Sequence, residues 1–152
     1  MEYKAIEDLV MPNIVPGVYG DVEITKNDAE GTYTLYHNQV RWMVTDLNFK
    51  EPADLFYSQY DLAYGNVLLT GLGFGIMATA LAQKEEVSSV TVLEISADVI
   101  DAFVKNNPNN PKINIILANA SEYETDVTYD CLLPDHYAVS YTHLTLPTNR
   151  EV

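Results

Sequence analysis

The sequence predicts an α/β fold in which strands and helices alternate to build a doubly wound parallel sheet, preceded by a small β-rich segment. From residue 66 onward, short apolar runs alternate with stretches of helical periodicity. A parallel strand is buried on both faces and therefore reads as a continuous apolar run. Glycines 71, 73 and 75 directly follow the first run, as a tight strand-to-helix turn requires. These observations favour a βαβαβ unit followed by another strand.

Length and composition are those of one globular domain. The chain has 152 residues, of which 47% are hydrophobic and 20% charged, and domains usually span about 100–200 residues. Acidic residues outnumber basic ones 22 to 8, giving a formal charge of -14. The few lysines and arginines are scattered singly, so no basic patch is expected to bind a phosphate backbone. The composition therefore argues against a nucleic-acid partner.

A cytoplasmic location is expected. Cys131 is the single cysteine, which excludes an intrachain disulfide. The opening segment MEYKAIEDLV is acidic, unlike a signal peptide. Residues 66–83 carry no charge, but three glycines interrupt them, so a strand and helix explain this run better than a membrane span. No membrane partner is expected.

The N-terminal segment, residues 1–64, is predicted to contain a β-hairpin and a helix. Expected strands cover 18–25 and 32–37 around the turn-rich KNDAEG, and a third covers 39–45 after a turn near Asn38. A helix is expected to begin at Glu51–Asp54, where proline lies in the first turn. The segment is rich in aromatic residues, which suit either an ordinary core or a wall for a cationic acceptor, with the core favoured: Tyr33, Tyr36, Trp42, Phe49, Phe56, Tyr57, Tyr60 and Tyr64.

The second region, residues 65–138, carries the expected parallel sheet. Its strands are predicted at 66–70, 89–95, 113–118 and 128–134. Helices are predicted from about 74 to 84 and after Ser96, a residue that caps helix N-termini well. The stretch NNPNNP is expected to end the second helix.

The glycine turn and one acidic residue form the candidate nucleoside site. Glycines without Cβ atoms let the backbone approach a ligand closely. The string GLGFG is G-x-G-x-G, so it departs from the dinucleotide fingerprint G-x-G-x-x-G of Rossmann folds. Glu94 ends the second predicted strand, 19 residues after Gly75, where an acid can accept hydrogen bonds from both ribose hydroxyls. Structural glycines and a solvated acid are the plainer alternatives.

Four motifs in this order resemble class I S-adenosylmethionine-dependent methyltransferases, and their spermidine synthase-like branch in particular. They are VLLTGLGFG, VTVLEIS, INIILANA and YDCLLPDHY. The resemblance implies a Rossmann-like fold with S-adenosylmethionine as cofactor. It also implies that the glycine turn packs against the amino acid moiety, while Glu94 binds the ribose and Ile95 covers the adenine. Asn119 stands where the family usually has an aspartate that contacts the adenine amine. The implied cofactor-binding residues are Gly71, Gly73, Gly75, Glu94, Ile95 and Asn119.

The acceptor side is predicted at the end of the fourth strand, where ligands bind in open α/β sheets. Asp135 ends that strand, and the resemblance implies that it faces the acceptor and orients an amine or removes its proton. His136 and Tyr137 follow and are expected to line the same pocket. A loop acid without a catalytic role is the alternative interpretation of Asp135.

The last segment, 139–152, differs in character from the rest. It is rich in threonine and has no helical period. Val139 to Thr148 resemble a translated transposase-type sequencing adapter. We therefore expect native sequence to stop near Ala138, with the parallel sheet truncated after its fourth strand; a genuine threonine-rich strand is the alternative.

The leading functional hypothesis is methyl transfer from S-adenosylmethionine to a small-molecule or protein acceptor. Aminopropyl transfer to a polyamine, as in spermidine synthase, is the first alternative. Aminopropyltransferases resemble one another in a GGGDGG turn, and Phe74 replaces its acid here, which favours methyl transfer. The second alternative is an inactive nucleoside-binding fragment, because a truncated chain is expected to lack activity.

Overall fold

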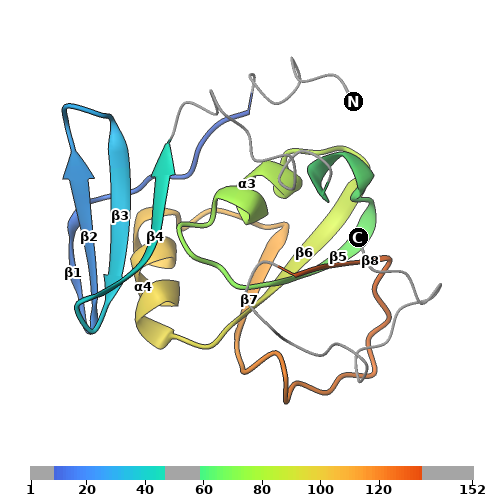
Figure 1. Cartoon of the computed structure of the whole chain (residues 1–152). Coiled ribbons are helices and arrows are strands. Elements are labelled where there is room, and N and C mark those ends of the chain that lie inside the picture. The colour runs from blue at the N-terminus through green and yellow to red at the C-terminus, as the bar shows by residue number, and fades with distance from the viewer. Residues whose placement is uncertain (1–8, 47–58, 135–152) are drawn as a thin grey trace.

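Two β-sheets share one hydrophobic core in the computed structural model of the chain, which describes residues 9–46 and 59–134 (Figure 1). The first sheet is antiparallel and N-terminal, and the second is parallel. Helices α3 (Ile76–Ala82) and α4 (Ala97–Asn106) lie between the antiparallel sheet and the parallel one in Figure 1. The predicted fold class, a parallel α/β sheet with a β-rich N-terminal segment, is confirmed.

The antiparallel sheet has the strand order β1-β2-β3-β4. Its strands are β1 (Gly17–Tyr19), β2 (Val22–Asn27), β3 (Thr32–His37) and β4 (Val40–Asp46). The prediction of one strand over 18–25 was wrong, because the chain reverses at Gly20 and Asp21 and β1 pairs back on β2. Gly20 has a φ of 62°, a left-handed conformation that glycine adopts readily.

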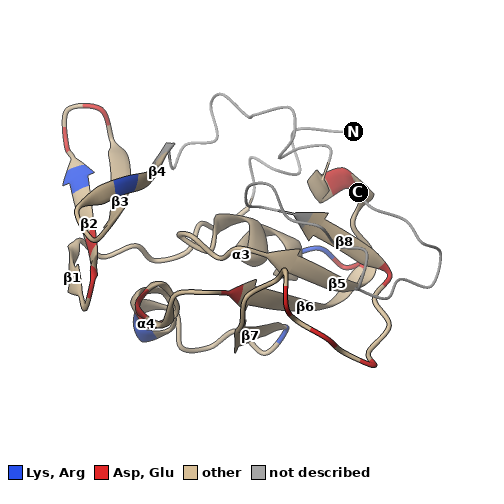
Figure 2. Ribbon diagram, turned by 60° about the horizontal axis from the view of Figure 1, so that its bottom comes forward, with Lys and Arg blue, Asp and Glu red and all other residues tan. Residues whose placement is uncertain are grey.

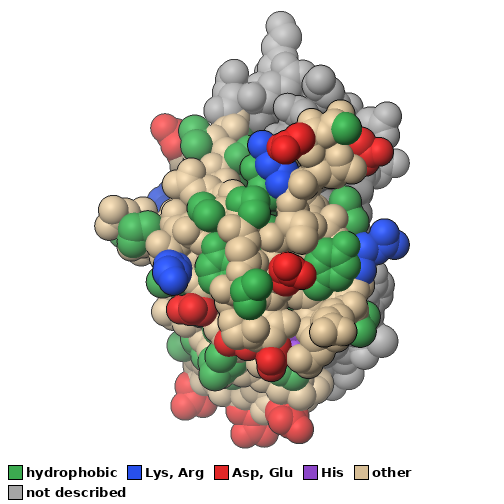
Figure 3. Space-filling model, turned by 90° about the vertical axis from the view of Figure 1, so that its left-hand side faces the viewer, with side chains coloured by type: hydrophobic (Ala, Val, Ile, Leu, Met, Phe, Trp, Pro, Cys, Tyr) green, Lys and Arg blue, Asp and Glu red, His purple; other side chains and the backbone are tan. Residues whose placement is uncertain are grey.

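One face of this sheet is buried, and the other carries both hydrophobic and charged side chains. Val22, Ile24 and Leu35 form the buried face and belong to the same core as the helices. Val18 and Val44 are exposed on the other face, because side chains alternate between the two faces of a strand. Figure 3 shows hydrophobic and charged side chains interspersed on this side of the molecule.

The parallel sheet has the order β7-β6-β5-β8. Its strands are β5 (Gly65–Thr70), β6 (Val87–Glu94), β7 (Ile113–Leu117) and β8 (Cys131–Pro134). The chain steps outward from β5 to β7 and then crosses back to pair β8 with the other side of β5. The strand order therefore reverses between β5 and β8, and ligands of open α/β sheets bind at such a reversal.

Both helices cover the same face of the parallel sheet. Helix α3 begins at Ile76, later than the predicted 74, because Gly75 holds the N-cap with a φ of 82° and Phe74 is buried in the core. Ser96 caps α4 as predicted, since its Oγ accepts a hydrogen bond of 3.2 Å from the Val99 N–H. Helix α4 ends at Asn106, at the start of the asparagine- and proline-rich stretch.

An irregular segment, residues 118–130, covers part of the opposite face. Leu68, Leu93 and Leu132 point to that face and pack with Tyr129 in a second, smaller cluster. Burial raises the pKa of the Tyr129 hydroxyl. The described connection from β7 to β8 contains no helix, whereas the buried residues of α3 and α4 pack in the larger cluster on the other side of the sheet.

Several predictions fall outside the described residues. They are the helix start at 51–54, the aromatic residues Phe49, Phe56 and Tyr57, and the tail 139–152. Among the residues that are described, no helix is long and apolar enough to cross a membrane.

Candidate functional site

The predicted nucleoside site lies where β5 and β6 end, beside the reversal of strand order. The glycine turn, residues 71–75, leaves the end of β5, and Glu94 is the last residue of β6. Figure 2 shows the acidic end of β6 next to the start of α4. The Gly71 N–H donates to the Leu93 carbonyl at 2.8 Å, which keeps the turn against β6. The structure therefore brings the glycine turn and Glu94 together.

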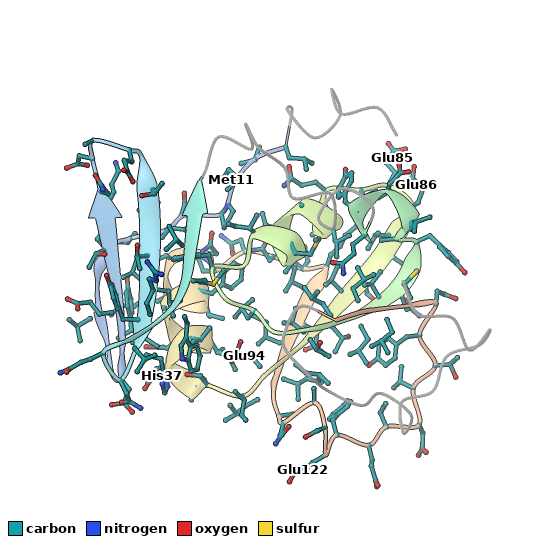
Figure 4. All side chains as sticks on the ribbon, viewed as in Figure 1. Met11, His37, Glu85, Glu86, Glu94 and Glu122 are labelled. Atoms are coloured by element: carbon teal, nitrogen blue, oxygen red, sulfur yellow. The ribbon has the colours of Figure 1, made fainter. Side chains whose placement is uncertain are left out.

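Glu94 ties the glycine turn to the start of α4. Its Oε1 accepts a hydrogen bond of 2.8 Å from the Leu72 N–H, and its Oε2 accepts one of 2.9 Å from the Ser96 N–H. The residue is only 6% exposed, and Figure 4 shows it pointing into the molecule, unlike the outward Glu122. A carboxylate has about four lone-pair sites, so each oxygen keeps one for a ligand hydroxyl.

The glycines differ in what surrounds them. A Cβ at Gly75 would overlap the Phe103 ring, so this glycine is needed for packing between the turn and α4. A Cβ at Gly73 would lie 2.6 Å from the Sδ of Met43 on β4, the end of a flexible side chain. Gly71, Gly73 and Gly75 all have positive φ angles of 89°, 55° and 82°. The turn therefore requires glycine for its backbone shape, and Gly75 requires it for packing too.

Ile95 and Asn119 follow the ends of β6 and β7. Ile95 is 63% exposed although it directly follows the buried Glu94, so its side chain is free to cover a flat ring. The Asn119 Oδ1 accepts hydrogen bonds from the Ser121 N–H at 3.0 Å and from its Oγ at 2.7 Å. These bonds occupy the carbonyl that was expected to accept from an adenine amine, which leaves the amide NH2 for a ligand.

The predicted acceptor residues Asp135, His136 and Tyr137 lie outside the described residues. Pro134, which precedes them, pairs with Thr70 at the end of β5. Their assignment to the acceptor side stays a prediction.

The antiparallel sheet also contributes to this region, which no pattern in the sequence indicated. Met43 lies against the glycine turn. The turn between β1 and β2 rests on α4, since the Asp21 N–H donates to Asp98 Oδ2 at 3.0 Å. Nothing in the local pattern of Met43 or Asp21 signals these contacts, because they join segments far apart in the chain.

Within the described ranges, no group of three or more His, Cys, Asp or Glu residues is placed to hold a metal ion. The site is therefore built from backbone amides, one carboxylate and apolar side chains. This combination suits an uncharged or cationic polar ligand with hydroxyl groups.

Solved structures with the same fold include two spermidine synthases. The enzyme from Thermotoga maritima aligns with a TM-score of 0.54 and 16% identity over 82% of this chain and 49% of its own. A spermidine synthase in complex with the transition-state analogue AdoDATO aligns with a TM-score of 0.56 and 17% identity, over 84% and 49% of the two chains. Coclaurine N-methyltransferase bound to N-methylheliamine and SAH aligns with a TM-score of 0.44 and 26% identity, over 53% of this chain and 24% of its own.

The expected similarity to spermidine synthases is confirmed at the level of the fold. The chain spans about half the length of the two spermidine synthases it matches. No protein-family model matches the sequence, and no curated protein does either.

Proposed function

We propose that the chain binds S-adenosylmethionine at the glycine turn and belongs to a methyltransferase that acts on a small-molecule or protein acceptor. The observation that carries this proposal is the position of Glu94. Its carboxylate stands at the end of β6, hydrogen-bonded to the glycine turn on one side and to the start of α4 on the other. That is the place where a ribose meets an acid in doubly wound folds.

The described residues fit such a ligand. Glu94 keeps lone pairs for two ribose hydroxyls, and the exposed Ile95 offers an apolar surface for the adenine. Met43 occupies the space beside Gly73, and its unbranched side chain can move aside at small cost. Asn119 is then expected to donate through its amide NH2, since its carbonyl is already bonded to Ser121.

The bound cofactor would supply an activated methyl group on a sulfonium. The chain's own task is to hold the two partners in line, which removes much of the entropic barrier. Asp135 is proposed to orient the acceptor and to take its proton. The acceptor is proposed not to be a nucleic acid, since a chain with a formal charge of -14 repels a phosphate backbone; no membrane partner is proposed.

Aminopropyl transfer from decarboxylated S-adenosylmethionine is the second candidate. The acidic surface would suit a cationic polyamine. Phe74 argues against it, because its side chain is buried in the core at the point of the turn where the resembling enzymes carry an acid.

Calorimetric titration of the full chain with three ligands tests the proposal. We expect S-adenosylmethionine and S-adenosylhomocysteine to bind, and decarboxylated S-adenosylmethionine to bind more weakly because it lacks part of the amino acid moiety that the glycine turn is proposed to contact. Stronger binding of the decarboxylated form would support aminopropyl transfer. Absence of binding by all three would refute the proposed function and favour an inactive fragment.

A further inference from the structure

An aromatic pair lies at the end of the antiparallel sheet that faces α4. The rings of His37 and Trp42 stack with centroids 4.2 Å apart and an angle of 12° between their planes. His37 pairs with Val22 across β2 and β3, and Val22 is completely buried. Because directly paired residues share a face of the sheet, the stack lies on the face that packs toward α4 and the glycine turn.

Two separate contacts hold the segment 37–43 beside the candidate site. At one end, Met43 lies against Gly73 of the glycine turn. At the other end, the Asn38 N–H donates to the Asp21 carbonyl at 2.9 Å, and the Asp21 N–H donates to Asp98 in the first turn of α4. The segment 37–43 therefore runs from the start of α4, just after Glu94, to the glycine turn. Figure 4 shows His37 and Glu94 on either side of the start of α4.

Trp42 is exposed in spite of this position. Its side chain is 45% exposed, whereas Val22, Ile24 and Leu35 on the same face are buried. A large aromatic ring left open on the inner side of a sheet, next to a ligand site, is a candidate contact for the ligand. One face of the indole rests on His37, so the remaining surface is held in a fixed orientation.

The charges at the start of α4 favour a cation. Asp21, Glu94 and Asp98 gather around the start of α4, where the hairpin is attached. An indole attracts a cation through its quadrupole, and this attraction strengthens when the cation is partly removed from water. A sulfonium is such a cation, and it lies between the ribose and amino acid parts of S-adenosylmethionine.

We propose that Trp42, held by His37, contacts the sulfonium side of the bound ligand and makes the site prefer the cationic S-adenosylmethionine to the neutral S-adenosylhomocysteine. This inference rests on the proposed function, because it assumes an adenosyl ligand on Glu94 and the glycine turn. In this proposal, a residue of the antiparallel N-terminal sheet makes the site select for a positively charged ligand.

The test compares the two ligands in the full chain by calorimetry, with wild type, Trp42→Leu and Trp42→Phe. Removing the indole should weaken S-adenosylmethionine binding about fivefold, in line with a partly desolvated cation–π contact. Binding of S-adenosylhomocysteine should change less than about twofold, because a neutral thioether gains little from the ring quadrupole. Trp42→Phe should fall between wild type and Trp42→Leu for the cationic ligand.

Tyr36→Leu is the matched control, since Tyr36 pairs with Glu23 on the opposite face of the same sheet. It should leave both affinities unchanged. Trp42 is the only tryptophan in the chain, so its fluorescence in wild type should change when S-adenosylmethionine binds. Equal weakening of both ligands in Trp42→Leu would overturn the charge-selective role, and unchanged affinities would overturn the contact itself. If wild type binds neither ligand, the proposed function fails, and the inference fails with it.

Discussion

Replacing Glu94 with alanine should destabilise the fold even without any ligand. The change leaves two backbone donors, the Leu72 and Ser96 N–H groups, without their carboxylate acceptor. Both residues are buried, at 4% and 8% exposure. A hydrogen bond to a charged group contributes about 1.5–3 kcal/mol, so the two bonds set an upper range of about 3–6 kcal/mol. Removing the buried charge recovers part of this loss, and we expect a net loss of about 3 kcal/mol.

Glu94→Gln refines the prediction. The glutamine side chain has one oxygen, which can accept from one of the two backbone N–H groups, but its NH2 then faces the second N–H and cannot accept from it. Glu94→Gln should therefore lose about half as much stability as Glu94→Ala. Urea unfolding of the full chain, followed by circular dichroism, measures both variants. The free energy of unfolding falls by about 1–3 kcal/mol per M of urea, so Glu94→Ala should lower the urea midpoint by about 1–3 M.

Glu122→Ala is the control, because Glu122 is an exposed acid at the surface of the irregular segment. It should change the free energy of unfolding by no more than about 0.5 kcal/mol. If Glu94→Ala unfolds at the same urea concentration as Glu122→Ala, the two hydrogen bonds do not hold the glycine turn and the reasoning is wrong.

Three further predictions concern packing and titration. Both Gly75→Ala and Gly73→Ala place alanine at a positive φ, which costs about 1–2 kcal/mol. Gly75→Ala should lose about 2–4 kcal/mol in total because its Cβ also overlaps the Phe103 ring, whereas at Gly73 the Cβ meets only the flexible Met43 side chain. Equal urea midpoints for the two variants would contradict this. Lys84→Met should lower the free energy of unfolding by about 2 kcal/mol, because the Lys84 Nζ donates to the carbonyls of Tyr60, Asp61 and Ala63 at 2.7–2.8 Å. Lys105 is exposed, so the control Lys105→Met should cost far less. Similar losses of stability in thermal melts of the two variants would refute the role of the three bonds. Burial raises the pKa of Tyr129 above its ordinary 10.0, so its contribution to stability is complete below about pH 10 and is lost as the pH rises further. The urea midpoint of Tyr129→Phe should therefore decrease less than that of wild type as the pH is raised above about 10. An equal decrease in both proteins would contradict the assignment.

The parallel half of the fold could be predicted because each element carries its own signal. Val67 to Leu69 form a continuous apolar run, and Ser96 is a strong cap. The break between β1 and β2 was missed, because Gly20–Asp21 lies inside an otherwise alternating apolar pattern and a two-residue turn leaves little trace there. The pairing between β3 and β4 also shifts between Leu35 and Tyr36, so the stack of Trp42 on His37 could not be read from strict alternation.

Site residues could be chosen from the sequence, but their contacts could not. Glu94 was recognised by its place after an apolar strand, whereas its bond to Leu72 joins residues 22 positions apart. Gly75 looked like a ligand contact, and only the packing of Phe103 reveals its second role. Such contacts depend on how α4 and the antiparallel sheet dock, which no local pattern encodes.

An amide NMR titration of the full chain with S-adenosylhomocysteine tests whether the ends of β5 and β6 form a nucleoside site. We expect the largest chemical-shift changes in the glycine turn, residues 71–75, and from Glu94 to Asp98, where the proposed ligand meets the backbone. Smaller changes should appear at Trp42 and Met43. Changes confined to other parts of the chain, or no change at saturating ligand, would contradict the assignment of this edge of the sheet as a nucleoside site.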